Sequence, residues 1–174
     1  MHFVVDSEGR MELDGTSVCC RLGRTGVRPW REKAEGDGAT PAGSWPFRGV
    51  LFRPDRGGPA PPTRLPAEAV AHDDGWCDAP NDPAYNRRVK LPYPASAERL
   101  WRGDSLYDLI VVLGYNDRPV VPGKGSAIFL HLAGPGPTEG CVAMERRDLE
   151  RLLALAAKGD RLVIRPQSKA SGEE

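Results

Sequence analysis

Glycine and proline break this sequence into short apolar runs, and this pattern limits the fold more than any other feature. The chain of 174 residues has 20 glycines and 17 prolines, which fall between the apolar runs. Glycine permits turn conformations, and proline interrupts helices and central strands. The distribution therefore predicts many turns and short strands, not a bundle of long helices.

Eight segments fit a strand pattern and one fits a helix pattern. Strands are expected at residues 2–5, 11–13, 16–22, 44–52, 106–115, 127–132, 140–144 and 161–164. In the third of these, Cys20 shares the apolar face, so it is expected in the core, and Cys19 points away. A helix is expected at residues 145–158, where leucines recur at helical spacing before Gly159. The fold class is predicted to be mainly β with one amphipathic helix.

We expect a single domain over residues 1–165, followed by a polar tail at 166–174. Residues 53–105 differ from the rest, because nine of the 17 prolines lie between Pro54 and Pro94, with aromatic residues among them. Long irregular segments in compact domains are commonly functional or disordered. The aromatic residues favour an ordered segment that shapes a substrate groove. A loop that only packs against the domain is the alternative.

Charge and hydropathy argue against several classes of partner. Lys plus Arg and Asp plus Glu both number 24, so no positive field favours nucleic acid. No run approaches the roughly 20 apolar residues that a membrane-spanning helix needs. No secretory signal is visible at the start, which indicates a cytoplasmic location. A periplasmic protein whose export signal had been removed would look the same.

The cysteines and histidines do not form a metal-binding pattern. The four cysteines have no C-x-x-C spacing and the three histidines are scattered, so neither a zinc site nor any other metal is expected. A disulfide framework is not expected either. The cysteines are therefore predicted to be free thiols.

One stretch combines a histidine and a cysteine in a way that suggests catalysis. His131 ends the expected strand at 127–132, and the pair Gly140-Cys141 opens the next element after a loop rich in glycine and proline. Such a loop can fold back sharply, which would bring imidazole and thiol within hydrogen-bond reach. A cysteine nucleophile needs a neighbouring base, because free cysteine is mostly protonated at neutral pH. The alternative is a packing cysteine beside a structural histidine.

Gly140 has a predicted role of its own. Without a side chain it would let a substrate approach the backbone, and the amides of Gly140 and Cys141 would bind a developing oxyanion.

The same stretch resembles the active-site signature of the L,D-transpeptidase (YkuD-type) catalytic domain, an upstream His followed by Ser/Thr-x-Gly-Cys. Here those positions are His131, Thr138, Gly140 and Cys141. Further segments resemble a bacterial branch of that family, and they extend the similarity to about residue 165: 23–26, 35–43, 74–78, 85–87 and 123–131. The resemblance implies an L,D-transpeptidase-like β-sandwich or open barrel of mixed sheets.

Three positions depart from the family pattern. Glu139 stands where many members have a second histidine, Ala143 where many have Arg or Asn, and only ten positions separate His131 from Cys141. If residues 138–142 are extended, Glu139 lies on the side of Cys141. It would then orient His131, or else it is a solvated loop residue.

The resemblance also implies a substrate, the peptidoglycan stem peptide or a muropeptide, and no cofactor. Cys141 would attack the diaminopimelate carbonyl and expel D-alanine, with His131 moving the proton. An amine or water would resolve the thioester, giving transpeptidase or carboxypeptidase activity, and a cytoplasmic location favours hydrolysis. Carbapenem-type inhibitors would acylate the same sulfur. The expected substrate-binding residues are Thr138, Glu139, Trp76, Tyr85 and Asn86.

Two other functions remain open. A papain-like cysteine peptidase would place its cysteine before its histidine, and this chain has the reverse order. A non-catalytic peptidoglycan-binding module would keep the fold without a reactive thiol.

Overall fold

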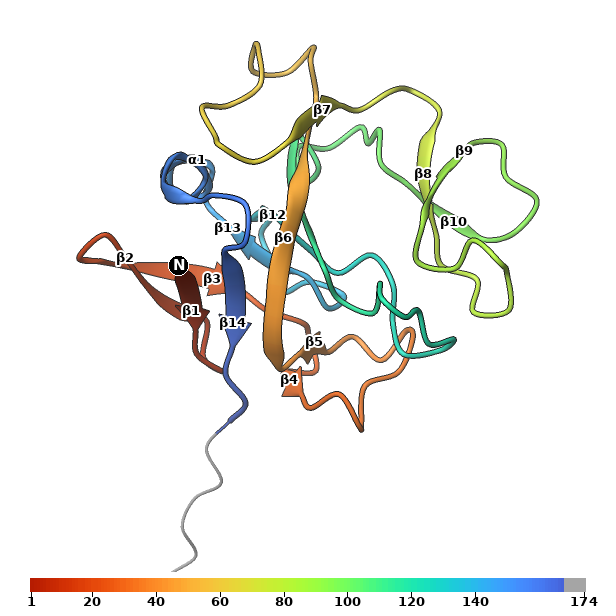
Figure 1. Cartoon of the computed structure of the whole chain (residues 1–174), viewed down its shortest axis with the longest axis horizontal. Helices are drawn as coiled ribbons and strands as arrows, with labels where there is room; N and C mark the ends of the chain where they lie inside the picture. Colours follow the sequence, from red (N-terminus) through yellow and green to blue (C-terminus); the bar gives the residue numbers. More distant parts are fainter. Residues whose placement is uncertain (168–174) are drawn as a thin grey trace, which may run out of the picture.

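Strands dominate the computed structural model, which describes residues 1–167 (Figure 1). The bounds are β1 His2–Val5, β2 Arg10–Leu13, β3 Thr16–Arg21, β4 Val27–Arg28, β5 Thr40–Pro41, β6 Gly43–Phe52, β7 Ala67–Ala69, β8 Asp74–Cys77, β9 Arg88–Lys90, β10 Ala97–Arg99, β11 Leu109–Leu113, β12 Phe129–Leu132, β13 Val142–Met144, α1 Arg146–Leu155 and β14 Arg161–Ile164. This confirms the mainly β prediction. Most of the predicted tail at 166–174 lies outside the described residues.

The large sheet curls into a barrel-like form. Its strand order is β11-β12-β13-β3-β2-β1-β14-β6-β7, and β11 also pairs with β6. That extra pairing joins strands far apart in the order, which closes the sheet upon itself. The sheet is mixed, because β1 with β14, β12 with β13 and β6 with β7 run parallel while the other pairs are antiparallel. The predicted open barrel of mixed strands is confirmed.

The helix α1 lies inside the predicted range of 145–158. Glu145 stays extended before it, and Ala156, also extended, ends it ahead of Gly159. Its apolar stripe (Leu149, Leu152 and Leu153) is buried in the core of the sheet. Within residues 1–167, no helix has the length and apolar character that crossing a membrane requires.

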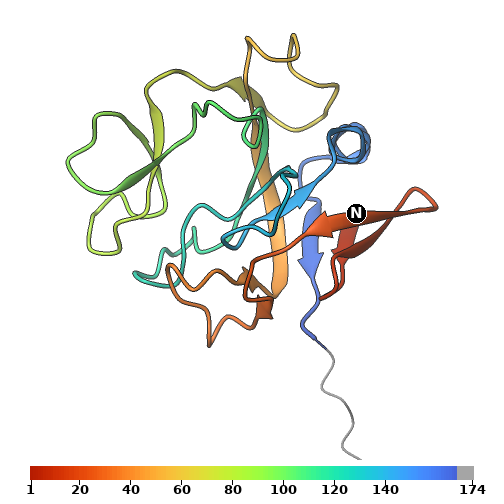
Figure 2. The ribbon, with the colours of Figure 1, turned by 180° about the vertical axis from the view of Figure 1, so that it is seen from behind.

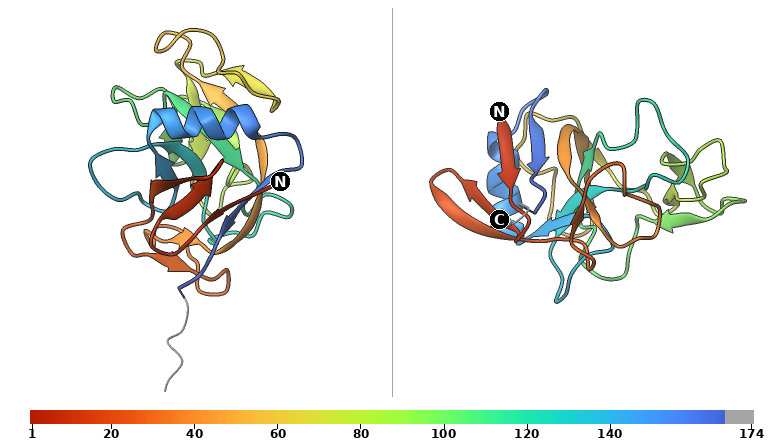
Figure 3. Two further views of the ribbon diagram at one scale, coloured as in Figure 1. Left: turned by 90° about the vertical axis from the view of Figure 1, so that its left-hand side faces the viewer. Right: turned by 90° about the horizontal axis from the view of Figure 1, so that it is seen from below.

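The proline-rich segment at 53–105 contains more regular structure than its sequence indicated. Strands β7 to β10 lie in it, and β10, β8 and β9 form a separate three-stranded antiparallel sheet. Figures 1 and 2 show this small sheet projecting to one side, and Figure 3 (right) shows α1 at the opposite end of the molecule. These strands are short and contain few β-branched or apolar residues, so they give no readable alternation.

Strand β12 separates two apolar clusters. Ile128, Leu130 and Leu132 belong to the larger cluster, inside the barrel. Ala127 and Phe129 belong to a second one, which Val70 and Leu100 join from residues 53–105, the segment we call the excursion. This division into two faces is the alternation that a strand at 127–132 requires. Cys20 is buried and Cys19 exposed, as their strand pattern predicted.

Candidate active site

Cys141 and His131 lie on the same face of two neighbouring strands. Strands β12 and β13 pair in parallel, with His131 in register with Ala143. Cys141 precedes β13, two positions from Ala143, so its side chain points to the side of His131. It packs with Phe129 in the second apolar cluster. The loop between the strands therefore brings the two side chains to one face, and the hydrogen bond between them that the sequence led us to expect is not formed among residues 1–167.

The thiol of Cys141 is buried and protonated in this structure. Its sulfur accepts the N–H of Phe129 at 3.3 Å and donates to the carbonyl of Ala127 at 3.1 Å. Burial raises the pKa of Cys141 to about 12, and the charge of Glu98 adds to the rise. The hydrogen bonds of residues 1–167 include none between this sulfur and the His131 ring.

The imidazole of His131 is held as one neutral tautomer. Nδ1 lies 2.8 Å from the carbonyl of Leu132, and a carbonyl only accepts, so Nδ1 carries the proton. Burial lowers the pKa of His131, which favours the neutral ring. Tyr107 packs edge-on against it, with the centroids 5.1 Å apart. Nε2 is therefore the nitrogen able to accept a proton.

Two threonine hydroxyls fix the backbone of the cysteine. Thr138 Oγ1 donates to the carbonyl of Cys141 at 2.7 Å, and Thr40 Oγ1 donates to the same oxygen at 3.3 Å. Thr40 is 0% exposed and also accepts the N–H of Gly23 at 2.8 Å. Loops that are far apart in the sequence thus meet behind the sulfur.

Gly140 is required by packing as well as by backbone conformation. Its φ is 138°, and a Cβ there would lie 2.8 Å from the carbonyl oxygen of Ala39. Its N–H donates to Thr138 Oγ1 at 3.1 Å. The amide is thus engaged in this structure, and its role in oxyanion binding stays a prediction.

A cavity of about 610 Å³ opens over these residues. Its lining includes His131 and Cys141, with Thr138 and Glu139 from the intervening loop. Tyr107 also lines the cavity, as do four more charged residues: Glu35, Asp78, Glu98 and Arg102. A buried thiol and a neutral imidazole therefore share one accessible space, which suits attack on a bound carbonyl.

Comparison with known proteins decides the family. The model of the L,D-transpeptidase catalytic domain (YkuD) matches residues 2–164. The chain belongs to this L,D-transpeptidase family. No curated protein matches it.

Two solved structures of L,D-transpeptidase 3 from Mycobacterium tuberculosis are similar to this chain. One, in complex with a faropenem-derived adduct, is 13% identical with a TM-score of 0.44. The other, at 1.32 Å resolution, is 14% identical with a TM-score of 0.47. Each comparison covers 95% of this chain and 60% of the other, so this chain spans about three fifths of their length.

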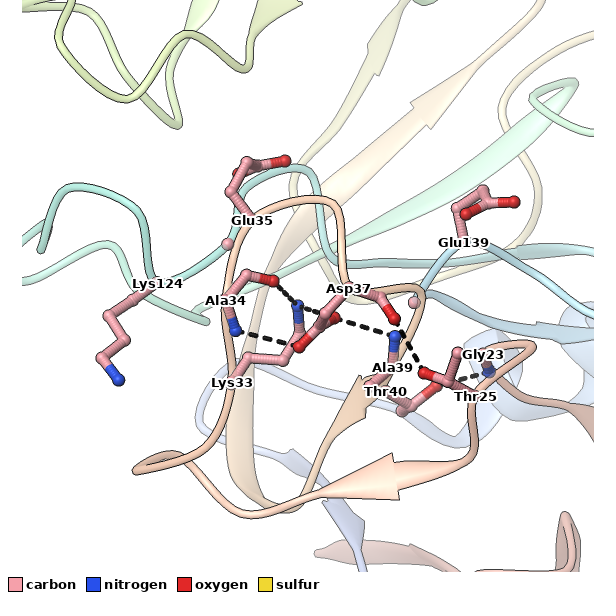
Figure 4. Close-up of polar contacts among 12 residues, drawn as sticks. Gly23, Thr25, Lys33, Ala34, Glu35, Asp37, Ala39, Thr40, Lys124 and Glu139 are labelled. Carbon is pink, nitrogen blue, oxygen red and sulfur yellow. Dashed lines mark hydrogen bonds and ion pairs between the residues drawn. The ribbon is translucent and has the colours of Figure 1, made fainter.

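Glu139, where many L,D-transpeptidases have histidine, lies at the rim of the cavity. Its side chain is 79% exposed and pairs with Arg24 at 2.9 Å. Figure 4 shows it apart from the bonded cluster of Lys33 and Asp37. The carboxylate is thus engaged by an arginine, which fits a solvated loop residue better than a partner of His131.

Trp76, Tyr85 and Asn86 lie behind the cavity and do not line it. The side-chain oxygen of Asn86 accepts Trp76 Nε1 at 2.9 Å and the N–H of Ala127 at 3.0 Å. Ala127 has a φ of 52°, unusual for alanine, and its carbonyl accepts the thiol of Cys141. Asn86, and Trp76 through it, therefore reach the nucleophile by way of Ala127. Tyr85 instead bonds to Glu35 and to the N–H of Gly125. Direct substrate contact by the three residues stays a prediction.

The loop that delivers Glu35 and Thr40 is held by a buried ion pair (Figure 4). Lys33 Nζ lies 2.8 Å from Asp37 Oδ1, and the same carboxylate accepts the N–H groups of Ala34 and Ala39. Burial alone would raise the pKa of Asp37, but these donors outweigh it and lower it. The loop is thereby ordered before any substrate binds.

Sequence analysis missed five residues of this site. Glu35 and Thr40 lie in the segment 35–43, and Asp78 lies in 74–78. Both segments resemble the family, but the resemblance did not indicate what these residues do. Ala127 lies in the resembling segment 123–131, but its positive φ gave no sequence signal, and Glu98 lies in none of those segments. Among residues 1–167, no three His, Cys, Asp or Glu side chains converge as a metal site requires.

Proposed function

We propose that this chain catalyses cysteine-dependent acyl transfer on peptidoglycan stem peptides, at the bond between diaminopimelate and D-alanine. The observation that supports it is the shared face of His131 and Cys141 on adjacent parallel strands, open to one cavity. Membership of the L,D-transpeptidase family supports the substrate class.

In the proposed reaction, the thiol first gives up its hydrogen bond to Ala127. His131 Nε2 takes the proton of Cys141 while the sulfur attacks the carbonyl carbon of diaminopimelate. The tetrahedral adduct then breaks its C–N bond, and His131 returns the proton to the leaving amine of D-alanine. A thioester remains on Cys141, and an amine or a water molecule resolves it.

The raised pKa of Cys141 fits proton transfer during attack rather than a resting thiolate. Burial keeps the sulfur protonated, and the lowered pKa of His131 keeps its ring neutral. The pair therefore rests uncharged, and charge develops only when a carbonyl is in place. Such a thiol would be unreactive toward water-borne oxidants and alkylating agents between turnovers.

The test is a product assay with a disaccharide-tetrapeptide, analysed by mass spectrometry. Wild type should release D-alanine and give a cross-linked dimer with an acceptor amine, whereas a carboxypeptidase would give tripeptide alone. Cys141→Ala should give neither product, and Cys19→Ala, which changes an exposed cysteine on β3, should match wild type. Absence of both products from every stem peptide would contradict the proposal.

A carbapenem gives an independent measurement. We expect a covalent adduct on Cys141 of the intact protein, and no adduct on Cys141→Ala. An adduct that persists in this variant would place the reactive sulfur elsewhere.

A further inference from the structure

Three carboxylates on one side of the cavity lack a cationic partner among residues 1–167. They are Glu35, Asp78 and Glu98, and we call this group the acidic wall. The other charged lining residues are paired, Glu139 with Arg24 and Arg102 with Asp104. The cavity therefore carries net negative charge on the side that faces the sulfur.

The hydrogen bonds to the acidic wall come from neutral groups, while the charge of Arg102 acts on Glu98 from the same cavity without an ion pair between them. Glu35 Oε2 accepts the hydroxyls of Tyr85 at 2.5 Å and Ser126 at 2.9 Å. Glu98 Oε1 accepts the hydroxyl of Tyr107 at 2.5 Å. Asp78 Oδ1 is buried and is the one such side-chain atom of residues 1–167 without a hydrogen-bond partner. Hydroxyls orient a carboxylate, but they do not cancel its charge.

The three charges act on one another and on the nucleophile. Burial raises the pKa of Glu98, the Tyr107 hydroxyl and the charge of Arg102 partly offset the rise, and the charges of Asp78 and Glu35 add to it. Glu98 in turn adds to the rise in the pKa of Cys141. In the empty cavity, the acidic wall therefore opposes formation of the thiolate.

The arrangement fits an organic cation better than a metal ion. Within residues 1–167, these side chains do not converge into a metal-binding group. Carboxylates spread along a cavity wall suit an ammonium on a flexible chain, because such a chain can bring the ammonium to each carboxylate.

We propose that Asp78 and Glu98 bind an ammonium group of the acyl donor, on the side chain of the residue whose carbonyl Cys141 attacks. This inference rests on the function proposed above. The bound ammonium offsets the charge of the acidic wall when the sulfur loses its proton. Substrate recognition and thiol activation are thereby one event, and a donor without the ammonium leaves the thiol inactive.

The experiment compares two synthetic stem tetrapeptides, identical except that one lacks the side-chain amino group and has hydrogen in its place. Single-turnover acylation of Cys141 is followed by mass spectrometry without an acceptor amine. Wild type should acylate at least tenfold faster with the amino peptide. Asp78→Asn and Glu98→Gln should each reduce that preference to threefold or less.

Glu12→Gln is the matched control, because it removes an exposed carboxylate on β2 that does not line the cavity. It should keep the tenfold preference. If Asp78→Asn or Glu98→Gln slows acylation by both peptides equally and keeps the tenfold preference, the residue has only a structural role. That result would overturn its assignment to ammonium binding. If a variant fails to fold, the acylation rates of wild type with the two peptides still test whether the ammonium matters.

Equal acylation of wild type by both peptides would overturn this inference while the thioester itself upheld the proposed function. A preference that arose only in the later transfer to an amine would also overturn it, since the ammonium would then belong to the acceptor. No thioester from either peptide would overturn both proposals.

Discussion

The two sides of the cavity differ in how their polar groups are balanced. On the β12–β13 side, the thiol, the imidazole and the carbonyl of Cys141 each have a neutral hydrogen-bond partner. On the acidic wall, three carboxylates have no cation among residues 1–167. The first side is complete without a ligand, and the second is completed by one. In the proposed function, acyl transfer thus takes place on the β12–β13 side, and recognition of the acyl donor belongs to the acidic wall.

The two sides also differ in what stabilises them. Strands β12 and β13 belong to the large sheet and pack in apolar clusters. Asp78 and Glu98 come from the excursion, whose small sheet contains Asp74, a carboxylate that is 0% exposed. It is bonded to Arg88 Nη2 at 2.5 Å and Lys90 Nζ at 2.9 Å. The excursion is therefore held by these ion pairs as well as by the apolar contacts of Val70 and Leu100, whereas the catalytic side is held by apolar packing.

The largest expected effect comes from the catalytic side. His131→Gln removes the base and should slow acylation of Cys141 by about 10³-fold. Stopped-flow or quenched mass spectrometry with the amino tetrapeptide measures this rate. A loss of less than tenfold would mean that another group accepts the proton.

On the excursion, Asp74→Asn should lower the free energy of unfolding by about 2–3 kcal/mol, because two charged donors lose their carboxylate. Urea denaturation at pH 7 gives this value. The β12–β13 side should keep its hydrogen-exchange protection, and loss of protection on both sides alike would break the comparison.

The same residue sets a pH window for stability. Burial alone would raise the pKa of Asp74, but Arg88 and Lys90 outweigh it and lower it from 3.8 to about 2. A lowered folded-state pKa means that the stabilisation is complete above about pH 4 and is lost as the pH falls toward 2. Thermal melts of wild type should show this loss, and Asp74→Asn should show a smaller one, because Asp37 and other carboxylates with lowered pKa still titrate.

Thr40→Val tests the backbone support of the nucleophile. It removes the donor to the Cys141 carbonyl and leaves the N–H of Gly23 buried without its acceptor. We expect a cost of about 1–2 kcal/mol in unfolding free energy. Acylation should slow about tenfold, and Thr40→Ser should restore most of both. Wild-type rates in Thr40→Val would remove Thr40 from the positioning of the sulfur.

The smallest effect is expected at the cavity rim. Glu139→Gln breaks an exposed ion pair with Arg24, and such pairs contribute about 0–1 kcal/mol. Acylation rate and unfolding free energy should both stay close to wild type. A tenfold change in rate would return Glu139 to the catalytic machinery.

Much of the sheet could be predicted because its strands carry a strong local pattern. Strands β1 and β14 have the predicted bounds, and the two faces of β12 follow its alternation. The small sheet of β8, β9 and β10 was missed because its strands have few β-branched or apolar residues, with the sequences DGWC, RVK and AER. Pairing across loops, not local pattern, forms them.

The site could be predicted in part for a similar reason. His131 and Cys141 are close in sequence and joined by a turn-rich loop, so their placement on one face follows from strand geometry. Glu35, Asp78 and Glu98 come from three separate loops or strands, and only closure of the fold brings them to one wall. The spacing of these three residues in the sequence therefore does not predict that they lie close together.

Strand β14 has a consequence for when the enzyme becomes competent during synthesis. It pairs with β1 on one side and β6 on the other, so it is the last piece to close the large sheet. A ribosome must release residues 161–164 before that closure occurs. The nascent chain therefore exposes Cys141 before the large sheet is complete.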